Sequence, residues 1–348
     1  MALLWIEGFE TFGSSAGSAP TGLGTKYLQE VSSANTILAA GRVSGFALKV
    51  SHGVSLPRIV TPNLGNHQTM VVGFAYQPGD ALGDNCRIVV FHQGSTEHFS
   101  LRVQTSGEVS VHLGTSATAV ATSTGASLAP NTWSYIEFKV TIGNAGVGSY
   151  EVRVNGVNVL SDSDQDTQNG GSAIADSIKF FGNSDSSSAN RSAFDDIYIL
   201  DDTGSENNDF LGSQKVVAII PTAAGDDTDF TPNSGNNYQA VDENGHDSDS
   251  SYVESGTSGH TDLYQFGDVS LTDIKGVQIN AVAKETDASP FSLNLLCKSD
   301  ATLDSGSPLA IGGTTYVSRS RILEEDPDTS APWTDSGIDA AQFGIEVD

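Results

Sequence analysis

The sequence is poor in cysteine and has no long apolar run. Its two cysteines, Cys86 and Cys297, lie far apart, so they exclude a disulfide framework or a thiolate metal cluster. We interpret them as inert thiols of a chain that folds in a reducing cytoplasm. The run Met1–Ile6 lacks a cationic segment and predicts a first strand, not a signal peptide. No stretch approaches the ~20 apolar residues of a membrane span, so we predict no membrane insertion.

Basic residues are also scarce. The chain has 16 Lys and Arg against 43 Asp and Glu, which gives a formal net charge of -27. The acidic excess is concentrated in residues 201–348. A surface of this sign repels phosphate backbones, so we predict no nucleic-acid partner. We attribute the acidity to solubility, with cation binding as the alternative.

Short alternating segments indicate the fold. The sequence has 37 glycines and many short polar turns, and no long helical period is visible. Apolar and polar residues alternate in Thr132–Val140, Tyr150–Gly156 and Phe194–Leu200, as in strands with one buried face. Asn155-Gly156 is a strong hairpin signal because both residues tolerate positive φ. We predict an all-β chain of two β-sandwich (jelly-roll) domains, and the order of these strands resembles a concanavalin or laminin-G-like jelly roll.

We expect three parts along the chain: a jelly roll over residues 1–202, a polar linker over 203–214, and a smaller acidic β-sandwich over 215–348. In the second domain, Lys215–Pro221 and Tyr238–Asp242 are predicted strands. The acidic, glycine-rich stretch Gly225–Ser258 is predicted to form loops.

Aromatic residues of the first segment have two interpretations. Trp133 and Tyr135 share one face of the predicted strand, and Phe138 lies on the other. They either pack in a sandwich core or form a platform on which a sugar stacks. We favour the core because aromatic side chains dominate such cores.

The strongest candidate for a metal site is the pair Asp195 and Asp196. Adjacent carboxylates can bind a hard cation together with backbone carbonyls, and calcium is the cation that this pair would hold. The alternative, which we favour, is that the carboxylates cap a turn. Asp162, Asp164 and Asp166 are a weaker set. The loop 242–249 fails the EF-hand spacing, since Gly stands at its fourth position.

Catalytic motifs are missing. Jelly-roll glycosidases usually carry Glu-x-Asp-x-x-Glu on one strand, because hydrolysis needs two carboxylates flanking the bond. This chain has no such string, and Glu137 and Glu151 stand alone. His92 and His98 flank a predicted hairpin turn, where they could approach each other with Glu97, but a surface hairpin explains them equally well. We therefore predict no catalytic residue, no cofactor and no enzymatic activity.

Several strings together resemble a group of tailed-bacteriophage virion proteins. In the first half they are Leu4–Glu10 and Phe194–Gly204. In the second half they are Pro221–Gly225, Asp229–Pro232, Asp262–Tyr264, Ile274–Ala281, Glu325–Thr329 and Pro332–Thr334.

The resemblance implies a non-enzymatic structural protein of the virion, assembled in the host cytoplasm. A tail-associated appendage, such as a fibre or tail tip that contacts host glycans, is the location we favour. A capsid (head) decoration protein is the alternative, and a jelly-roll carbohydrate-active enzyme is the second alternative. The expected partners are other virion proteins, a host-surface glycan and further copies of this chain, for which a trimer is one option.

Overall fold

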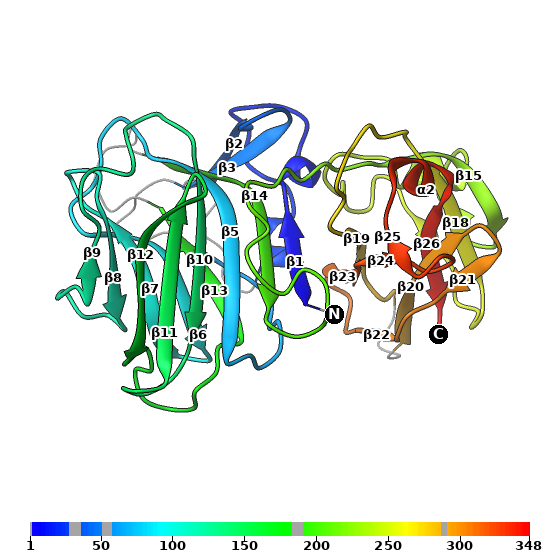
Figure 1. Ribbon diagram of the computed structural model, residues 1–348. Coiled ribbons are helices and arrows are strands. Elements are labelled where there is room, and N and C mark those ends of the chain that lie inside the picture. Colours follow the sequence, from blue (N-terminus) through cyan, green and yellow to red (C-terminus); the bar gives the residue numbers. More distant parts are fainter. Residues whose placement is uncertain (1, 28–35, 51–57, 183–190, 287–290) are drawn as a thin grey trace. The chain divides into compact units, whose positions relative to one another are not determined.

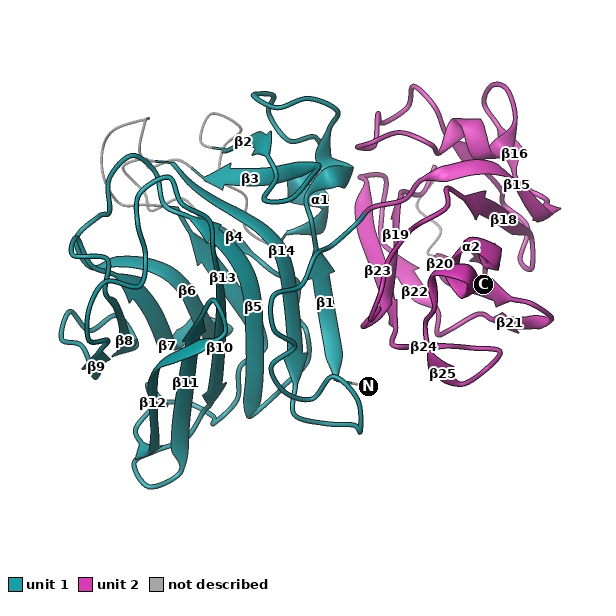
Figure 2. Ribbon diagram, turned by 45° about the horizontal axis from the view of Figure 1, so that its top comes forward, with its two compact units in different colours: residues 1–217 teal, residues 218–348 magenta. Residues whose placement is uncertain are grey.

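Antiparallel strands make up nearly all of the regular structure in a computed structural model of the chain (Figure 1). The structure describes residues 2–27, 36–50, 58–182, 191–286 and 291–348. The predicted all-β sandwich class is confirmed. The chain separates into two units, unit 1 at residues 1–217 and unit 2 at 218–348 (Figure 2). In the described part, no helix has the length and apolar character needed to cross a membrane.

Unit 1 consists of two sheets that face each other as layers (Figure 1). Sheet A has the strand order β12-β11-β10-β5-β14-β3-β2, with β1 paired to β14. Its strands are β1 (Leu3–Glu7), β2 (Thr36–Ala40), β3 (Phe46–Val50), β5 (Thr69–Gln77), β10 (Ser134–Thr141), β11 (Gly148–Val154), β12 (Val157–Gln165) and β14 (Ser192–Asp201).

Sheet B has the order β4-β13-β6-β7-β8-β9. Its strands are β4 (Arg58–Val60), β6 (Cys86–Gln93), β7 (Thr96–Val103), β8 (Val109–Leu113), β9 (Ala121–Thr122) and β13 (Ser177–Phe181). Two short helices, η1 (Glu10–Phe12) and α1 (Leu23–Lys26), follow β1 in the chain.

The core of unit 1 lies between the two sheets. Alternate residues of each strand point inward, and Phe138 of β10 meets Phe91 of β6 at a ring-centroid distance of 5.2 Å. Aromatic pairs in edge-on contact add to the free energy gained by burying their area. Since the period of a strand is two, the residues between these core positions form the outer face of each sheet.

The outer face of sheet A is covered by the segment that follows β14. Phe210 lies against the guanidinium of Arg153, with the Arg153 Cζ atom 3.9 Å from the ring centroid. The Gly212 N–H donates to Glu137 at 2.8 Å. Residues 203–214, predicted as a linker, therefore belong to unit 1 and pack on its sheet.

Unit 2 contains a second antiparallel sheet, in the order β15-β18-β26-β20-β21, with β22 paired to β20. Its strands are β15 (Pro221–Thr228), β18 (Thr261–Phe266), β20 (Phe291–Ser299), β21 (Thr302–Asp304), β22 (Leu309–Ile311) and β26 (Gln342–Val347). A two-stranded ribbon of β19 (Val277–Ala283) and β23 (Val317–Leu323) packs with it around Trp333 and Phe343. The remaining elements are β16 (Thr231–Pro232), β17 (Val253–Glu254), β24 (Glu325–Asp326), β25 (Ala331–Pro332), η3 (Asn237–Ala240) and α2 (Asp335–Ala340).

Three local predictions in the second half were wrong. Residues 215–220 form no strand, and the Val216 N–H donates to the side chain of Asp196 instead of to a neighbouring strand. The segment around Tyr238 is the 3-10 helix η3, whose capping box uses Gln239. The stretch from Gly225, predicted as loop, begins inside the edge strand β15. This strand starts with Pro221, and at that position the missing N–H of proline costs no hydrogen bond to the neighbouring strand.

One glycine of sheet A allows a close contact between the backbone and a ring. A Cβ atom at Gly73 would lie 2.1 Å from the Tyr198 ring. We therefore expect Gly73→Ala to lower the free energy of unfolding of unit 1 by about 1–3 kcal/mol through overpacking. Chemical denaturation followed by tryptophan fluorescence measures this. Gly256→Ala, where no atom lies within 4 Å of the added Cβ, is the control and should change nothing. Equal stability of both variants would contradict the packing described here.

Candidate functional site

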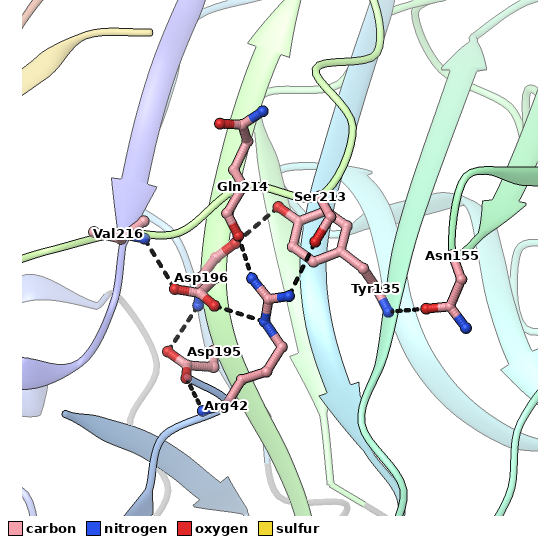
Figure 3. A network of polar contacts seen from close by, with 8 residues as sticks. All are labelled: Arg42, Tyr135, Asn155, Asp195, Asp196, Ser213, Gln214 and Val216. Carbon is pink, nitrogen blue, oxygen red and sulfur yellow. Dashed lines mark hydrogen bonds and ion pairs between the residues drawn. The ribbon is translucent and has the colours of Figure 1, made fainter. Parts of the chain in front are cut away.

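The predicted metal pair lies on the outer side of sheet A, at an irregularity of β14. Asp195 and Asp196 are buried, with 1% and 3% exposure, and the register of β14 on β5 shifts just after Asp195. Asp196 has a φ of 50° in the left-handed region, which Asp tolerates better than most residues. The shift places both carboxylates near the loop that carries Arg42 (Figure 3).

Both carboxylates are already partnered in the structure (Figure 3). Asp195 Oδ2 accepts from the Arg42 backbone N–H at 2.7 Å, and Asp196 Oδ2 accepts from Arg42 Nε at 2.8 Å. Asp196 Oδ1 accepts from the Val216 N–H at 2.9 Å. The same guanidinium donates to the Ser213 hydroxyl and the Gln214 carbonyl, so it joins the end of β14 to the covering segment.

Electrostatics around this pair come from burial and from like charge. Burial, together with the neighbouring charge of Asp196, raises the pKa of Asp195 to about 7. Within the described part of the chain, no group of three or more His, Cys, Asp or Glu side chains is arranged to hold a metal ion. The calcium site at Asp195 and Asp196 is not tested by these findings and stays a prediction.

The aromatic side chains predicted as core lie on both sides of sheet A. Phe138 belongs to the core between the sheets. Tyr135 is buried on the outer side, where its hydroxyl donates to the Asp196 carbonyl at 3.0 Å and Arg42 covers its ring. Trp133 precedes β10 and is half-buried. Tyr135 is therefore closed off by the covering segment and offers no platform for a sugar.

The outer face of sheet B gathers basic and histidine side chains from four strands. We call this set the polar face: Arg87, His92, Glu97, His98, Arg102, His112 and Lys179. Each of these except Glu97 is next in sequence to a core residue, so alternation points it outward. Glu97 joins them because a bulge sets Glu97 and His98 opposite His92 alone.

The register places the members of the polar face in neighbouring rows. One row crosses four strands. Lys179 of β13 pairs with Val90 of β6, Val90 pairs with Ser100 of β7, and Ser100 pairs with His112 of β8. One row further along β6, His92 pairs with Glu97. Adjacent strands are separated by about 4.8 Å, so the rows form one continuous patch across the sheet.

Glu97 is shared by two cations at the centre of this patch. Its Oε1 lies 3.0 Å from Lys179 Nζ, and its Oε2 lies 2.6 Å from Arg87 Nη1. Burial raises the pKa of Glu97, but the Lys179 bond and the Arg87 charge outweigh it, so the net shift is downward. The carboxylate is ionised at neutral pH, and two positive charges against one leave the group cationic.

The two histidines beside this ion pair are incompletely hydrogen-bonded in the described structure. His92 is 4% exposed and His98 is fully buried. Within the described residues, three of their ring nitrogens make no hydrogen bond of good geometry. These are both nitrogens of His92 and the Nε2 of His98. Burial and the nearby Lys179 charge lower the pKa of His92 to about 4, so its ring is neutral at pH 7.

His98 has a defined tautomer. Its Nδ1 accepts from the Asn169 N–H at 3.3 Å, so in the neutral ring the proton is on Nε2. That buried Nε2–H makes no hydrogen bond of good geometry. Burial lowers the pKa of the ring, although the Ile174 backbone lies near enough to oppose that shift. Buried polar atoms without partners are costly and uncommon, and several on one face of one sheet indicate a place for a ligand or water.

The patch extends towards β8 through a second basic group. Arg102 donates from Nη2 to the Ser116 carbonyl at 2.7 Å, while its Nε has no partner in the described structure. Burial and the Arg87 charge lower its pKa. The Ser116 carbonyl also accepts from His112 Nδ1 at 3.1 Å, so Ser110 donates to the other ring nitrogen at 2.9 Å.

The two outer faces of unit 1 differ in how their polar groups are satisfied. On sheet A, Glu137 accepts from Tyr198 and from Gly212, and Asp196 accepts from Arg42 and Val216. On sheet B, His92, His98 and Arg102 each retain a buried atom that makes no hydrogen bond of good geometry. Of the two, the polar face of sheet B is the candidate functional site.

Sequence reasoning missed most of this site. His92 and His98 flank the turn of the β6–β7 hairpin, as predicted, and Glu97 lies with them, but the side chains of both histidines are buried and not exposed at its surface. Lys179, Arg87 and Arg102 carry no local motif, because sheet pairing brings them together from distant segments.

Known proteins resemble this chain in fold only. No family model matches the chain, and no curated protein matches it. Among solved structures, alginate lyase Aly36B matches with a TM-score of 0.38 and 10% identity, covering 56% of this chain and 95% of that one. The endo-β-1,4-glucuronan lyase of the fungus Trichoderma reesei has a TM-score of 0.34 and 10% identity, covering 45% and 82%.

Two further structures belong to the same set. The PL-14 alginate lyase of Aplysia kurodai has a TM-score of 0.36 and 14% identity, covering 49% of this chain and 88% of that one. The receptor-binding domain of botulinum neurotoxin C/D mosaic serotype has a TM-score of 0.35 and 14% identity, covering 47% of this chain and 41% of that one.

These findings correct the predicted function. The chain was expected to be a non-enzymatic virion structural protein and not an enzyme, and both expectations were wrong. The similar structures include polysaccharide lyases and a sialidase, and none of those named is a virion protein. The resemblance to phage proteins, with the virion location, virion partners and trimeric assembly drawn from it, stays an untested prediction. At this level of similarity, the chemistry must come from the side chains of this chain.

Acid should destabilise unit 1 through the buried histidine. The folded pKa of His92 is about 4 and the ordinary value is 6.5, so between these pH values the unfolded chain binds a proton that the folded chain does not. This contribution to stability is complete above pH 6.5 and is lost as the pH falls towards 4.

We expect His92→Gln to reduce this acid-induced loss by roughly 2–3 kcal/mol. Urea unfolding at pH 7, 5 and 4 measures it, with His260→Gln in unit 2 as the matched control. A wild-type chain and a His92→Gln variant with the same pH profile would show that His92 is not held neutral by burial.

Proposed function

We propose that the chain is a carbohydrate-active enzyme that cleaves an anionic polysaccharide by β-elimination at the polar face of sheet B. The observation that carries the proposal is one arrangement. His92, a neutral histidine whose ring nitrogens make no hydrogen bond of good geometry in the described structure, lies beside a carboxylate shared by Lys179 and Arg87. The polysaccharide lyases named above catalyse cleavage of polymers of this class, but the proposal is based on the residues of this chain.

Charge favours an anionic substrate at this place. The chain carries 16 basic residues in all, and Arg58, Arg87, Arg102 and Lys179 lie together on the outer side of sheet B. Arg58 and Arg87 contact the ring of Phe181, with Cζ atoms 5.9 and 4.7 Å from its centroid. In a protein with a net charge of -27, a local cationic patch directs an acidic polymer to one face.

The reaction requires removal of a proton α to a carboxylate. In a uronate unit, a base takes the C5 proton, the electron pair forms the C4=C5 double bond, and the C4–O bond to the leaving sugar breaks. His92 is neutral at pH 7 and so can accept this proton, and the negative charge of a bound uronate would raise its pKa from about 4 towards the range of an effective base. Lys179 and Arg87 would pair with the substrate carboxylate and stabilise the negative charge that develops on it.

His98 would assist the leaving group. Its Nε2–H makes no hydrogen bond of good geometry in the described structure, and after release from the nearby Ile174 backbone it would bond to the oxygen that leaves C4. That oxygen then takes a proton from water. Because His98 is fully covered in this structure, and Asn169 binds both its Nδ1 and the Glu97 carbonyl, the segment around Asn169 must move to admit a sugar.

Hydrolysis by two carboxylates fits the face less well. A general acid must hold a proton, and Glu97 is ionised by its two cations. Asp176, the other carboxylate near His92, accepts from the Ser177 hydroxyl at 2.5 Å and the Gly94 N–H at 3.2 Å. With both carboxylates engaged, elimination is the reaction that the available groups support.

Cleavage can be tested directly on uronate polymers. We expect the chain to release unsaturated products from alginate, polygalacturonate or polyglucuronate, detected by the ultraviolet absorbance of the C4=C5 bond. Because general-base catalysis contributes about 10²–10⁴-fold, His92→Ala should lower kcat by at least about 100-fold. Lys179→Met should raise KM and lower kcat, since it removes a partner of the carboxylate.

The matched control is His246→Ala, which removes a histidine of unit 2 and should retain full activity. Circular dichroism verifies that each variant is folded. The proposal fails if the folded wild-type chain binds these polymers without cleaving any of them, or if folded His92→Ala keeps wild-type activity.

A further inference from the structure

A depression lies next to the polar face, at the end of sheet B where β7, β8 and β9 meet the turn after β7. It has a volume of about 380 Å3, within the range of small-ligand sites. Residues of the turn, of β8 and β9, and of the loop between them line it, among them Asn85, Gln104, Glu108, His112 and Thr122.

Hydrogen bonds fix the orientation of the amide at its centre. Gln104 donates from Nε2 to the Ser110 hydroxyl at 2.6 Å, and the same amide group lies 3.5 Å from Asn85 Oδ1. Ser110 in turn donates to His112. Since the N–H groups of Gln104 are directed to these partners, its carbonyl oxygen is left as an acceptor.

Acceptors predominate in the depression. Beside Gln104, the carboxylates of Asp84 and Glu108 line it, and its lining contains no lysine or arginine. Glu108 is held by the Ser106 hydroxyl, which donates to its Oε2 at 2.9 Å. The site therefore presents negative charge and oxygen acceptors to whatever enters it.

The neighbouring polar face has the opposite charge. Arg102 and His112 both bind the Ser116 carbonyl, and Ser116 directly precedes Ala117 in the depression wall. The outer surface of sheet B therefore changes in charge along its width. It is positive on the polar face around Lys179 and Arg87 and negative in the depression around Glu108. We call the two regions together the strip. A polymer lying along this strip would meet two environments of opposite sign.

We infer that the depression is a subsite for a sugar unit that carries no carboxylate or sulfate. The hydroxyl groups of such a unit would donate to Glu108, Asp84 and the Gln104 carbonyl. A uronate unit would be repelled by the two carboxylates. This inference rests on the proposed function, because it places the depression on the same substrate path. The preferred substrate then carries a non-acidic unit near the uronate that is cleaved, and uronate homopolymers are poorer substrates that leave this depression empty.

Binding without turnover tests the subsite separately from catalysis. The full chain is titrated with three trisaccharides, followed by isothermal calorimetry and by NMR: mannotriose as a neutral probe, chitosan trimer as an amino-sugar probe, and trigalacturonate as an acidic probe. We expect saturable binding of the neutral or the amino probe. Glu108→Gln should weaken it about tenfold, since hydrogen bonds to charged groups are the stronger ones.

Matched substitutions separate the two halves of the strip. Glu254→Gln, an exposed carboxylate of unit 2, should change nothing, and Lys179→Met should weaken trigalacturonate but not the non-acidic probe. If neither non-acidic probe binds, or if Glu108→Gln leaves binding unchanged, the subsite is wrong even when uronate polymers are cleaved. If a non-acidic probe binds through Glu108 but no polymer is cleaved, the subsite stands and the proposed function fails.

Discussion

The ion pair at Glu97 is the interaction on which the candidate site depends. One carboxylate, ionised and partly buried, holds Lys179 of β13 and Arg87 of β6 at fixed positions beside His92. Removing it would leave two cations under a poorly hydrated surface, where like charges repel strongly. With it in place, the group keeps one positive charge in excess and the nearby imidazole stays neutral. That combination suits a carboxylate-bearing substrate.

The fold separates structural polar groups from reactive ones by using the two sides of one sandwich. The segment after β14 closes the outer side of sheet A, and Arg42 joins it to Asp195 and Asp196 (Figure 3). The outer side of sheet B is also buried, with the segments around Ser116 and Asn169 bonded to it, but in the described part of the chain His92 and Arg102 retain atoms without a hydrogen bond of good geometry. Similar residue types therefore have different roles, and the difference lies in what packs on them.

Local pattern in the sequence was sufficient for the all-β class, because alternation and the Asn155-Gly156 turn are local signals. It was insufficient for Pro221–Thr228, which has the composition of a loop but pairs as an edge strand. The site was still less accessible: Lys179 and Glu97 are 82 positions apart and meet only through the β13-β6-β7 order. In the sequence, only the short spacing of His92, Glu97 and His98 indicated this site. That spacing is the same whether the three residues lie in an exposed turn or at a buried bulge. The contrast between the two sheets' outer faces appears only once both are assembled.

A crystal structure of the full-length His92→Asn variant with a bound uronate oligosaccharide tests the central claim most directly. We expect a substrate carboxylate within hydrogen-bond distance of Lys179 Nζ or Arg87, with C5 of that unit facing position 92. An oligosaccharide bound elsewhere on the chain, with the Glu97 ion pair and His98 still covered, would contradict it.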